Sequence, residues 1–161
     1  PYMKITYKLN MYEWRTGRRC TYKNQVHLVF VTKYRRDVFT LEMGETLKQV
    51  FGETCEQMQC ELMEYGFEAD HVHLMVQVHP KVAVSNLVGK LKGKSSYVLR
   101  RDYWESVKTK LWGDKFWSPS YCVVSCGGGS LEQFAAYIDS QRKPPSERAV
   151  KQSKAIAQNN K

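Results

Sequence analysis

Residues 70–79 alternate polar and apolar side chains, which is the pattern of a β-strand with one buried face. The face expected to point into a core carries Val72, Leu74, Val76 and Val78. The opposite face carries His71, His73, Met75, Gln77 and His79. The run therefore predicts a sheet that is covered on one side and open on the side of the histidines.

His71 and His73 are two positions apart on the same expected strand face. Two imidazoles in this arrangement can bind one metal ion. Strand histidines are also often solvated or hydrogen-bonded to polar neighbours. The pair taken alone leaves both interpretations open.

The segments around this strand predict the order strand, helix, strand, strand, helix, strand. The strands are expected at residues 25–32, 60–67, 71–79 and 121–126. The helices are expected from Thr40, a plausible N-cap, to about Met58, and over residues 84–103. This βαββαβ order is typical of an α+β ferredoxin-like or RRM-like core, with an antiparallel sheet and both helices on one face. Residues 104–120 are expected to be irregular.

One folded domain is expected, at residues 24–143. Residues 1–23 are polar, aromatic and basic without clear periodicity, and are interpreted as a basic N-terminal arm. A further helix is expected to begin at Ser130, after a run of three glycines, and to end before Pro144. Residues 144–161 are interpreted as a polar C-terminal tail.

The chain carries 25 Lys and Arg against 16 Asp and Glu, a net charge of +9, which favours a polyanionic partner such as nucleic acid. Its five cysteines and the lack of a hydrophobic signal segment predict free thiols in a reducing cytoplasm. The cysteine spacing does not fit a zinc site. No apolar run approaches the ~20 residues needed to cross a bilayer, so no membrane partner is expected.

Tyr137 and Gln141 lie four residues apart on the expected last helix and would be surface neighbours. A tyrosine hydroxyl can attack phosphorus next to a metal-activated phosphate, and an amide oxygen suits a hard cation. With His71 and His73 they would make a mixed shell for Mg²⁺ or Mn²⁺. Because the chain has ten tyrosines, helix position alone leaves Tyr137 equally open to being a surface aromatic.

Several blocks of the sequence resemble the single-tyrosine HUH transposases of the smallest bacterial and archaeal insertion sequences. The resemblance runs from about Lys23 to Gln141. The blocks are residues 34–36 (YRR), 70–74 (DHVHL), 91–96 (LKGKSS), 111–112 (LW), 117–121 (WSPSY) and 137–141 (YIDSQ). The paired histidines alone are a weak pattern, whereas their combination with the late Tyr-x-x-x-Gln is specific.

The resemblance implies a DNA transposase that cuts single-stranded DNA at the ends of its element. His71, His73 and Gln141 would match the metal ligands, with Mg²⁺ or Mn²⁺ as the cofactor. Tyr137 would match the nucleophile, giving a 5′-phosphotyrosine intermediate and a free 3′-hydroxyl. That hydroxyl can later reseal the DNA without ATP, because one phosphoester replaces another.

Members of that family are homodimers that bind imperfect DNA hairpins near the element ends. A hinge for exchanging the tyrosine helix between subunits is expected at Gly127, Gly128 and Gly129. Charge alone suggests the candidates for DNA-backbone contact, beside the N-terminal arm: Lys33, Arg35, Arg36, Lys90, Lys94 and Arg101.

The other two histidines and Asp70 are not expected to bind the metal ion. His27 is expected to have a structural role, as a core residue or as a partner of the metal ligands. His79 is expected to lie too far along its strand to bind the same ion, and Asp70 to be a turn residue.

Two alternative functions stay open. The first is a host-domesticated HUH nuclease that acts on repeated palindromes with the same chemistry. The second is a non-catalytic single-stranded nucleic-acid-binding protein, which would be expected to carry aromatic residues on the central strands. The histidines on the exposed face disfavour this second alternative.

Overall fold

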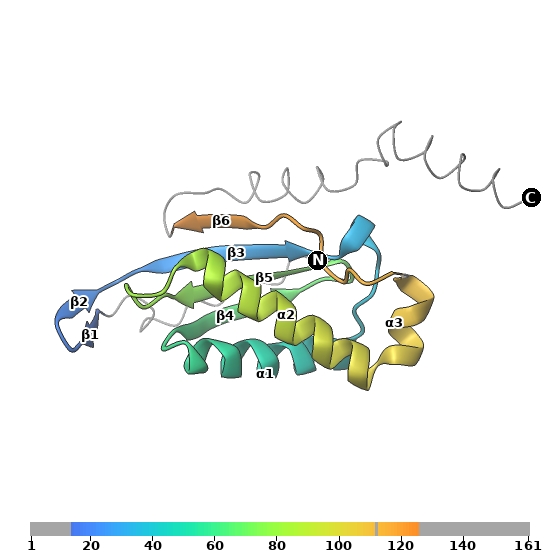
Figure 1. Ribbon diagram of the computed structural model, residues 1–161, viewed down its shortest axis with the longest axis horizontal. Coiled ribbons are helices and arrows are strands. Elements are labelled where there is room, and N and C mark those ends of the chain that lie inside the picture. The colour runs from blue at the N-terminus through green and yellow to red at the C-terminus, as the bar shows by residue number, and fades with distance from the viewer. Residues whose placement is uncertain (1–13, 112, 126–161) are drawn as a thin grey trace, which may run out of the picture.

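The computed structural model describes residues 14–111 and 113–125, and Figure 1 shows its elements. The strands are β1 (Arg15–Gly17), β2 (Cys20–Tyr22), β3 (Gln25–Val31), β4 (Glu61–Phe67), β5 (His71–Gln77) and β6 (Cys122–Ser125). The helices are α1 (Leu41–Gln57), α2 (Val84–Asp102) and α3 (Trp104–Lys110), and a short 3₁₀ turn spans Lys33–Arg35.

The main sheet has four antiparallel strands in the order β4-β5-β3-β6. β4 and β5 form a hairpin, and β5 lies between β3 and β4, which the α1 crossover connects. This split βαβ arrangement is that of the ferredoxin-like fold, and it confirms the α+β class expected from the sequence. β5 is a central strand, hydrogen-bonded to a neighbour on each side.

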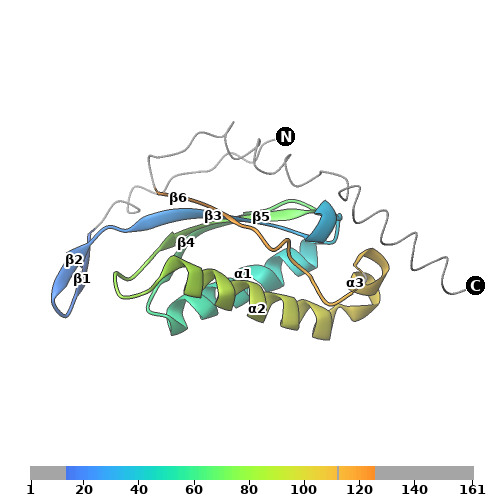
Figure 2. The ribbon, with the colours of Figure 1, turned by 45° about the horizontal axis from the view of Figure 1, so that its top comes forward.

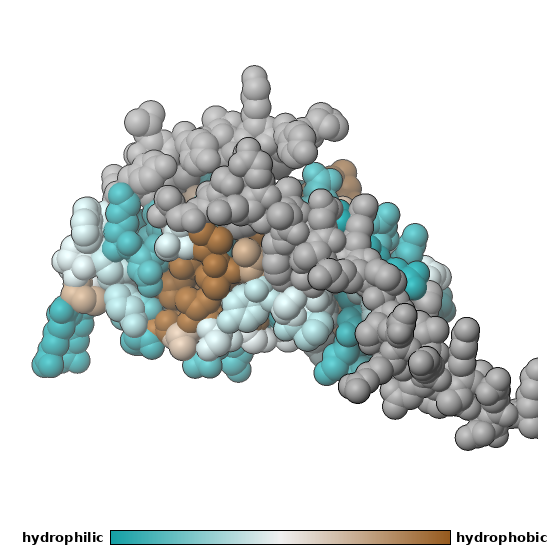
Figure 3. Space-filling view, turned by 90° about the horizontal axis from the view of Figure 1, so that it is seen from above, coloured by the Kyte–Doolittle hydropathy of each residue, from teal (hydrophilic) through white to brown (hydrophobic). Residues whose placement is uncertain are grey.

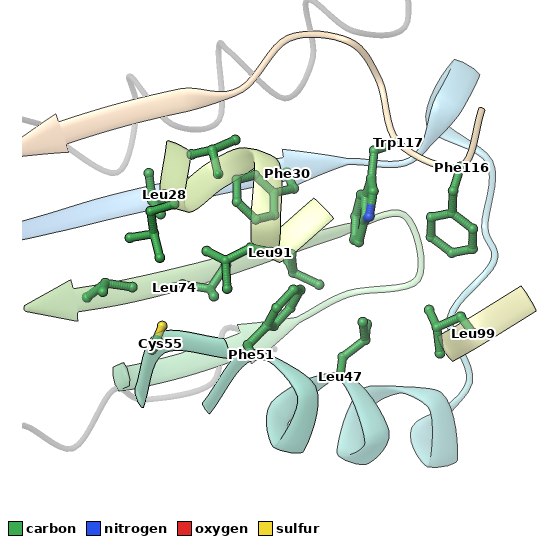
Figure 4. Close-up of a cluster of buried hydrophobic side chains, with 14 of the residues drawn as sticks. Leu28, Phe30, Leu47, Phe51, Cys55, Leu74, Leu91, Leu99, Phe116 and Trp117 are labelled. Carbon is green, nitrogen blue, oxygen red and sulfur yellow. The ribbon is translucent and has the colours of Figure 1, made fainter. Parts of the chain in front are cut away.

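Helices α1 and α2 cover one face of this sheet (Figures 1 and 2). Their apolar sides meet the inward residues of β3 and β5 in one core, part of which Figure 4 shows. Fully buried side chains at its centre include Leu28, Phe30, Leu47, Phe51, Leu74 and Leu91. Because Val72, Leu74, Val76 and Val78 are all buried, the predicted facing of the histidine strand is confirmed.

Helix α1 begins where the sequence predicted, since the Thr40 hydroxyl accepts a hydrogen bond from Met43 N at 3.3 Å. Its first turn packs closely on β4. A Cβ atom added to Gly44 would lie 2.0 Å from Cζ of Phe67, and Tyr65 Oη donates to Gly44 O at 3.0 Å. The absence of a side chain at Gly44 therefore lets helix and strand approach each other.

Helix α2 is fastened to the segment that leads into β6. Lys92 Nζ donates to Ser118 O at 2.8 Å and to Ser120 O at 2.7 Å, and Trp117 Nε1 donates to Ser95 Oγ at 3.0 Å. Burial lowers the pKa of Lys92 to about 8. These contacts fix the course of the chain before the edge strand.

Three expectations need correction. β1 and β2 pair as a hairpin within the expected irregular arm, and α3 occupies part of the segment expected to be irregular. The histidine face of β5 is not open along its whole length, because Met75 is 5% and Gln77 2% exposed. The three glycines and the helix expected after them lie outside the described residues.

Candidate active site

The two histidines lie at one end of the sheet, next to the 3₁₀ turn that follows β3. In the antiparallel register, Val31 lies opposite His71 and Val29 lies opposite His73. Both histidines alternate with buried Val72, so they share the face of the sheet away from α1 and α2. The structure thus brings the two predicted ligands onto one face, with His73 exposed and His71 mostly covered.

The imidazole of His71 is hydrogen-bonded to the carboxylate of Asp70. His71 Nδ1 lies 2.7 Å from Asp70 Oδ1, and Arg35 Nε donates to Asp70 Oδ2 at 2.5 Å. Burial by itself would raise the pKa of Asp70, but the hydrogen bonds and charges of His71 and Arg35 lower it overall. Asp70 therefore stays ionised and accepts from both neighbours.

His73 lies over a glycine of the adjacent strand. It is the register partner of Gly66, and a Cβ added to Gly66 would lie 2.4 Å from the Cε1 and Nε2 atoms of His73. Partial desolvation of the ring lowers the pKa of His73, and the charges of His71 and His27 lower it further. The imidazole therefore remains neutral, and able to bind a metal ion, at a pH where an ordinary histidine takes up a proton.

The other two histidines lie farther along the sheet. His27 is opposite Met75, so it shares the face of His71 and is not on the core side, and burial lowers its pKa. His79 lies past the far end of β5, where its ring meets Tyr22 at a centroid distance of 5.3 Å. The length of β5, roughly 20 Å at ~3.4 Å per residue, separates His79 from His71. This placement agrees with the expectation that His79 is not a ligand.

The basic residues of the 3₁₀ turn lie at the same end as His71. Lys33 Nζ lies 5.0 Å from the ring centroid of Tyr34, whose side chain is exposed, and Arg36 is exposed too. Arg35 differs, because its side chain is only 12% exposed and turns onto Asp70. At this end of the sheet Arg36 is thus exposed and Lys33 half-buried, whereas the Arg35 side chain is mostly covered and contacts Asp70.

The second set of predicted DNA contacts lies on α2, in the layer on the other side of the sheet (Figure 2). Lys90 is exposed, and Lys94 Nζ donates to Gln57 Oε1. Arg101 lies 5.7 Å from the ring centroid of Tyr97 and pairs with Asp102. The structure therefore divides the six candidate DNA-contact residues between the turn after β3 and helix α2, and their role remains a prediction.

A hollow of about 810 Å³ lies at the hairpin end of the molecule, away from His71 and His73. Its lining includes Gly17, Arg18, Arg19, His79 and Lys81. In the view from above, hydrophilic side chains lie at this end and at the other, and a hydrophobic patch lies between them (Figure 3). The described part of the basic arm therefore contributes its charge at the opposite end of the sheet from the paired histidines.

The remaining predicted site residues, Tyr137 and Gln141, lie outside the described residues. Within residues 14–111 and 113–125, no group of three His, Cys, Asp or Glu side chains could hold a metal ion. The described part of the chain thus offers two imidazoles on one face. This donor set fits a divalent ion such as Mn²⁺, or Mg²⁺ where oxygen ligands from elsewhere make up most of the shell.

Sequence reasoning missed the contacts that surround these imidazoles. It left Asp70 as a turn residue and gave no role to Gly66. An acidic residue directly before the first strand histidine, and a glycine inside a strand, were the available signals.

Comparison with known proteins decides the family. The model of the family described as "Transposase IS200 like" matches residues 20–141, which include both histidines and the late tyrosine. The chain belongs to the IS200-like transposase family. This membership supports an enzyme that cuts and rejoins DNA.

Similar proteins agree with this assignment to the IS200-like family. The ISDra2 transposase TnpA of Deinococcus radiodurans is 33% identical over 137 residues, covering 85% of this chain and 97% of that protein. The transposase for insertion sequence element IS200 of Salmonella typhimurium is 35% identical over 101 residues, covering 63% of this chain and 66% of that protein.

Solved structures support the fold. A crystal structure from Deinococcus radiodurans R1, described as a transposase, has a TM-score of 0.71 and 30% identity, covering 81% of this chain and 99% of that one. A REP-associated tyrosine transposase bound to a REP hairpin has a TM-score of 0.50 at 10% identity, covering 78% and 69%. In the part of this chain that the structure describes, no helix is long and apolar enough to cross a membrane.

Proposed function

We propose that this IS200-like transposase cuts and rejoins single-stranded DNA at the ends of an insertion sequence, through a covalent bond to Tyr137. The proposal has His71, His73 and Gln141 as ligands of Mg²⁺ or Mn²⁺. The observation that carries it is the placement of His71 and His73 on one sheet face, with His71 Nδ1 occupied by Asp70. Family membership and the Tyr-x-x-x-Gln motif support the assignment of Tyr137 and Gln141.

The reaction exchanges one phosphoester for another. The Tyr137 oxygen loses its proton and bonds to the scissile phosphorus, while the bond from phosphorus to the 3′-oxygen breaks and that oxygen takes up a proton. In the second step a 3′-hydroxyl attacks the phosphotyrosine and releases the phenol. No ATP is needed, because the number of phosphoester bonds does not change. When bound, the divalent ion would offset negative charge that develops on the phosphate.

The protein's own residues would prepare this site. Asp70 contacts His71 Nδ1, and the lowered pKa of His73 favours a neutral ring, which keeps a lone pair for a metal ion. Lys33 and Arg36 lie at the same end of the sheet and would attract the DNA backbone. Phosphate contacts of this kind fix the position of the strand but carry no sequence information.

The DNA partner is proposed to be a single strand whose ends form hairpins. One structural relative of this fold is bound to a REP hairpin, which supports a hairpin partner here as well. A homodimer is proposed too, with the three glycines before residue 130 acting as the hinge that carries Tyr137 to its own or its partner's histidines.

A domesticated nuclease is the second candidate function. The similarity to a REP-associated transposase favours it, but at 10% identity that similarity concerns the fold alone. The relatives at 33–35% identity are transposases of insertion sequences, which favours the mobile-element function. Element ends in the DNA flanking the gene would distinguish the two.

The decisive test incubates the full chain with a labelled single-stranded oligonucleotide that carries an element end, in Mg²⁺ or Mn²⁺. We expect a covalent protein–DNA adduct that is lost in Tyr137→Phe and strongly reduced in His71→Ala. Tyr103→Phe is the matched control, because it removes a tyrosine hydroxyl away from the histidines. The Tyr103 and Thr46 hydroxyls share a hydrogen bond of 2.7 Å on the helical side of the sheet. An adduct in Tyr137→Phe would contradict the assignment of Tyr137 as the nucleophile. Equal activity on duplex DNA would contradict the assignment of single-stranded DNA as the substrate.

A further inference from the structure

The carboxylate of Asp70 lies between two nitrogen donors from different parts of the chain. Oδ1 is 2.7 Å from His71 Nδ1, and Oδ2 is 2.5 Å from Arg35 Nε. The three side chains are 10–15% exposed, so water competes little for these bonds. Each carboxylate oxygen has its own partner, and the three residues form a chain from Arg35 through Asp70 to His71.

Arg35 reaches Asp70 through an unusual backbone turn. Tyr34 has a φ angle of 57° and Arg35 a φ angle of 53°, a left-handed conformation that is unfavourable for residues other than glycine. The turn is tied to Asp70 a second time, because Thr32 N donates to Asp70 O at 2.9 Å. The Thr32 hydroxyl also donates to Arg36 O at 2.7 Å. The fold thus keeps two residues in an unfavourable backbone conformation, at the turn from which the Arg35 guanidinium reaches Asp70.

The hydrogen bond to Asp70 determines the protonation pattern of His71. An ionised carboxylate can only accept, so His71 Nδ1 must carry a proton. In a neutral imidazole the lone pair then lies on Nε2. Metal-binding histidines commonly have such a carboxylate behind them, which fixes the tautomer and raises the basicity of the ligand atom.

We propose that Asp70, held in place by Arg35, is a positioning residue that keeps His71 in the Nδ1–H form with Nε2 as the free donor atom. Its benefit for metal binding rests on the function proposed above, whereas the tautomer is a property of the protein without metal. The proposal also gives Arg35 an internal role, in contrast to the phosphate contact expected from its charge.

The first test measures the tautomer directly, by ¹⁵N NMR of the imidazoles in the metal-free, full-length chain. His71→Gln assigns the His71 signals among the four histidines. We expect the Nδ1–H form for His71 in the wild type and a shift towards the Nε2–H form in Asp70→Ala. Arg35→Gln, which leaves Asp70 in place, should give a smaller shift in the same direction. The dispersion of the backbone amide spectrum verifies folding of each variant.

The second test measures Mn²⁺ affinity by titration calorimetry. We expect Asp70→Ala to weaken binding about 10- to 100-fold, with a smaller loss in Arg35→Gln. Asp102→Asn is the matched control, because it removes another arginine–aspartate pair, at 2.7 Å, on α2. That variant should leave both the tautomer and the affinity unchanged.

The outcomes separate this inference from the proposed function. An unchanged His71 tautomer in folded Asp70→Ala would overturn the positioning role. The two results can also differ: the His71 tautomer shifts as expected in Asp70→Ala, but the wild-type chain binds no Mn²⁺. That outcome would support the positioning of His71 and overturn the metal site. Loss of affinity equal in Asp70→Ala and Asp102→Asn would contradict a specific role for Asp70.

Discussion

The imidazole of His73 lies over Gly66 of the neighbouring strand, in a space that no other amino acid would leave free. A Cβ atom at Gly66 would come within 2.4 Å of Cε1 and Nε2 of His73, far inside the normal contact distance. Glycine within a strand usually weakens it, so its presence here indicates that the close approach has a use. The lack of one side chain on β4 therefore determines where a ligand on β5 can lie.

Replacement of Gly66 by alanine should move His73 while the fold is retained, because the imidazole can rotate about its side-chain bonds. We expect Gly66→Ala to weaken Mn²⁺ binding about tenfold or more, measured by calorimetry. Gly52→Ala is the control, since a Cβ there has no neighbour within 4 Å. Equal Mn²⁺ affinity in the two variants would show that Gly66 does not set the position of His73.

Replacement of Gly44 by alanine should instead reduce stability. The new methyl group would lie 2.0–2.5 Å from three ring atoms of Phe67, and forcing such overlap in a packed region costs about 1–3 kcal/mol. Gly52→Ala lies in the same helix without such contacts and should stabilise it by roughly 0.5–1 kcal/mol. Urea unfolding measures both changes. A Gly44→Ala variant as stable as Gly52→Ala would contradict the described contact between α1 and β4.

Acidification should destabilise the chain in part through His27. Burial lowers the pKa of His27 below the ordinary 6.5, so between these two values the unfolded chain binds more protons than the folded one. The contribution of His27 to stability is therefore complete above pH 6.5 and decreases as the pH falls towards the folded pKa.

The free energy of unfolding, measured from pH 8 to pH 5, should fall less steeply in His27→Gln than in the wild type. His73 has a pKa shift of the same sign, so some slope should remain in the variant. An NMR titration of His27 in the folded chain should have its midpoint below 6.5. A midpoint above that value would reverse the sign of this prediction.

The two sets of basic residues should be separable by salt dependence. Each phosphate contact on single-stranded DNA contributes ~0.7 to the slope of log K against log salt. If Lys33 and Arg36 contact phosphates, Lys33→Gln with Arg36→Gln should reduce the slope by about 1.4. The triple replacement of Lys90, Lys94 and Arg101 by glutamine should reduce it by about 2.1 if all three contact phosphates.

Fluorescence anisotropy at several salt concentrations measures these slopes. Because the two sets lie on different elements, the turn after β3 and helix α2, their effects should add in the combined variant. A set whose replacement leaves the slope unchanged makes no phosphate contact, and the corresponding prediction from charge would be wrong.

The main elements could be predicted from the sequence because their signals are local. The strand β5 is recognised because apolar residues recur at every second position. Helix α1 is recognised because Thr40, a good N-cap, directly precedes apolar residues at helical spacing. β1 and β2 were missed because three residues each are too few to show periodicity. α3 was missed because only Val107 is buried on it, so it has no apolar stripe.

The contacts of the candidate site were harder to foresee. The bond between Arg35 and Asp70 joins residues 35 positions apart and depends on two left-handed residues, which no local pattern of side chains announces. The face shared by His71 and His73, by contrast, follows from strand geometry alone. Tyr137 and Gln141 could be proposed only from their spacing and from the family resemblance.

The central place of β5 has a mechanical consequence. Hydrogen bonds join β5 to β3 on one side and to β4 on the other, and core strands of this kind are among the last parts of a domain to open. The spacing of the two imidazoles is thus as durable as the domain itself. In the transposition cycle proposed here, the two histidines would stay fixed, and Tyr137 and the DNA would move to meet them.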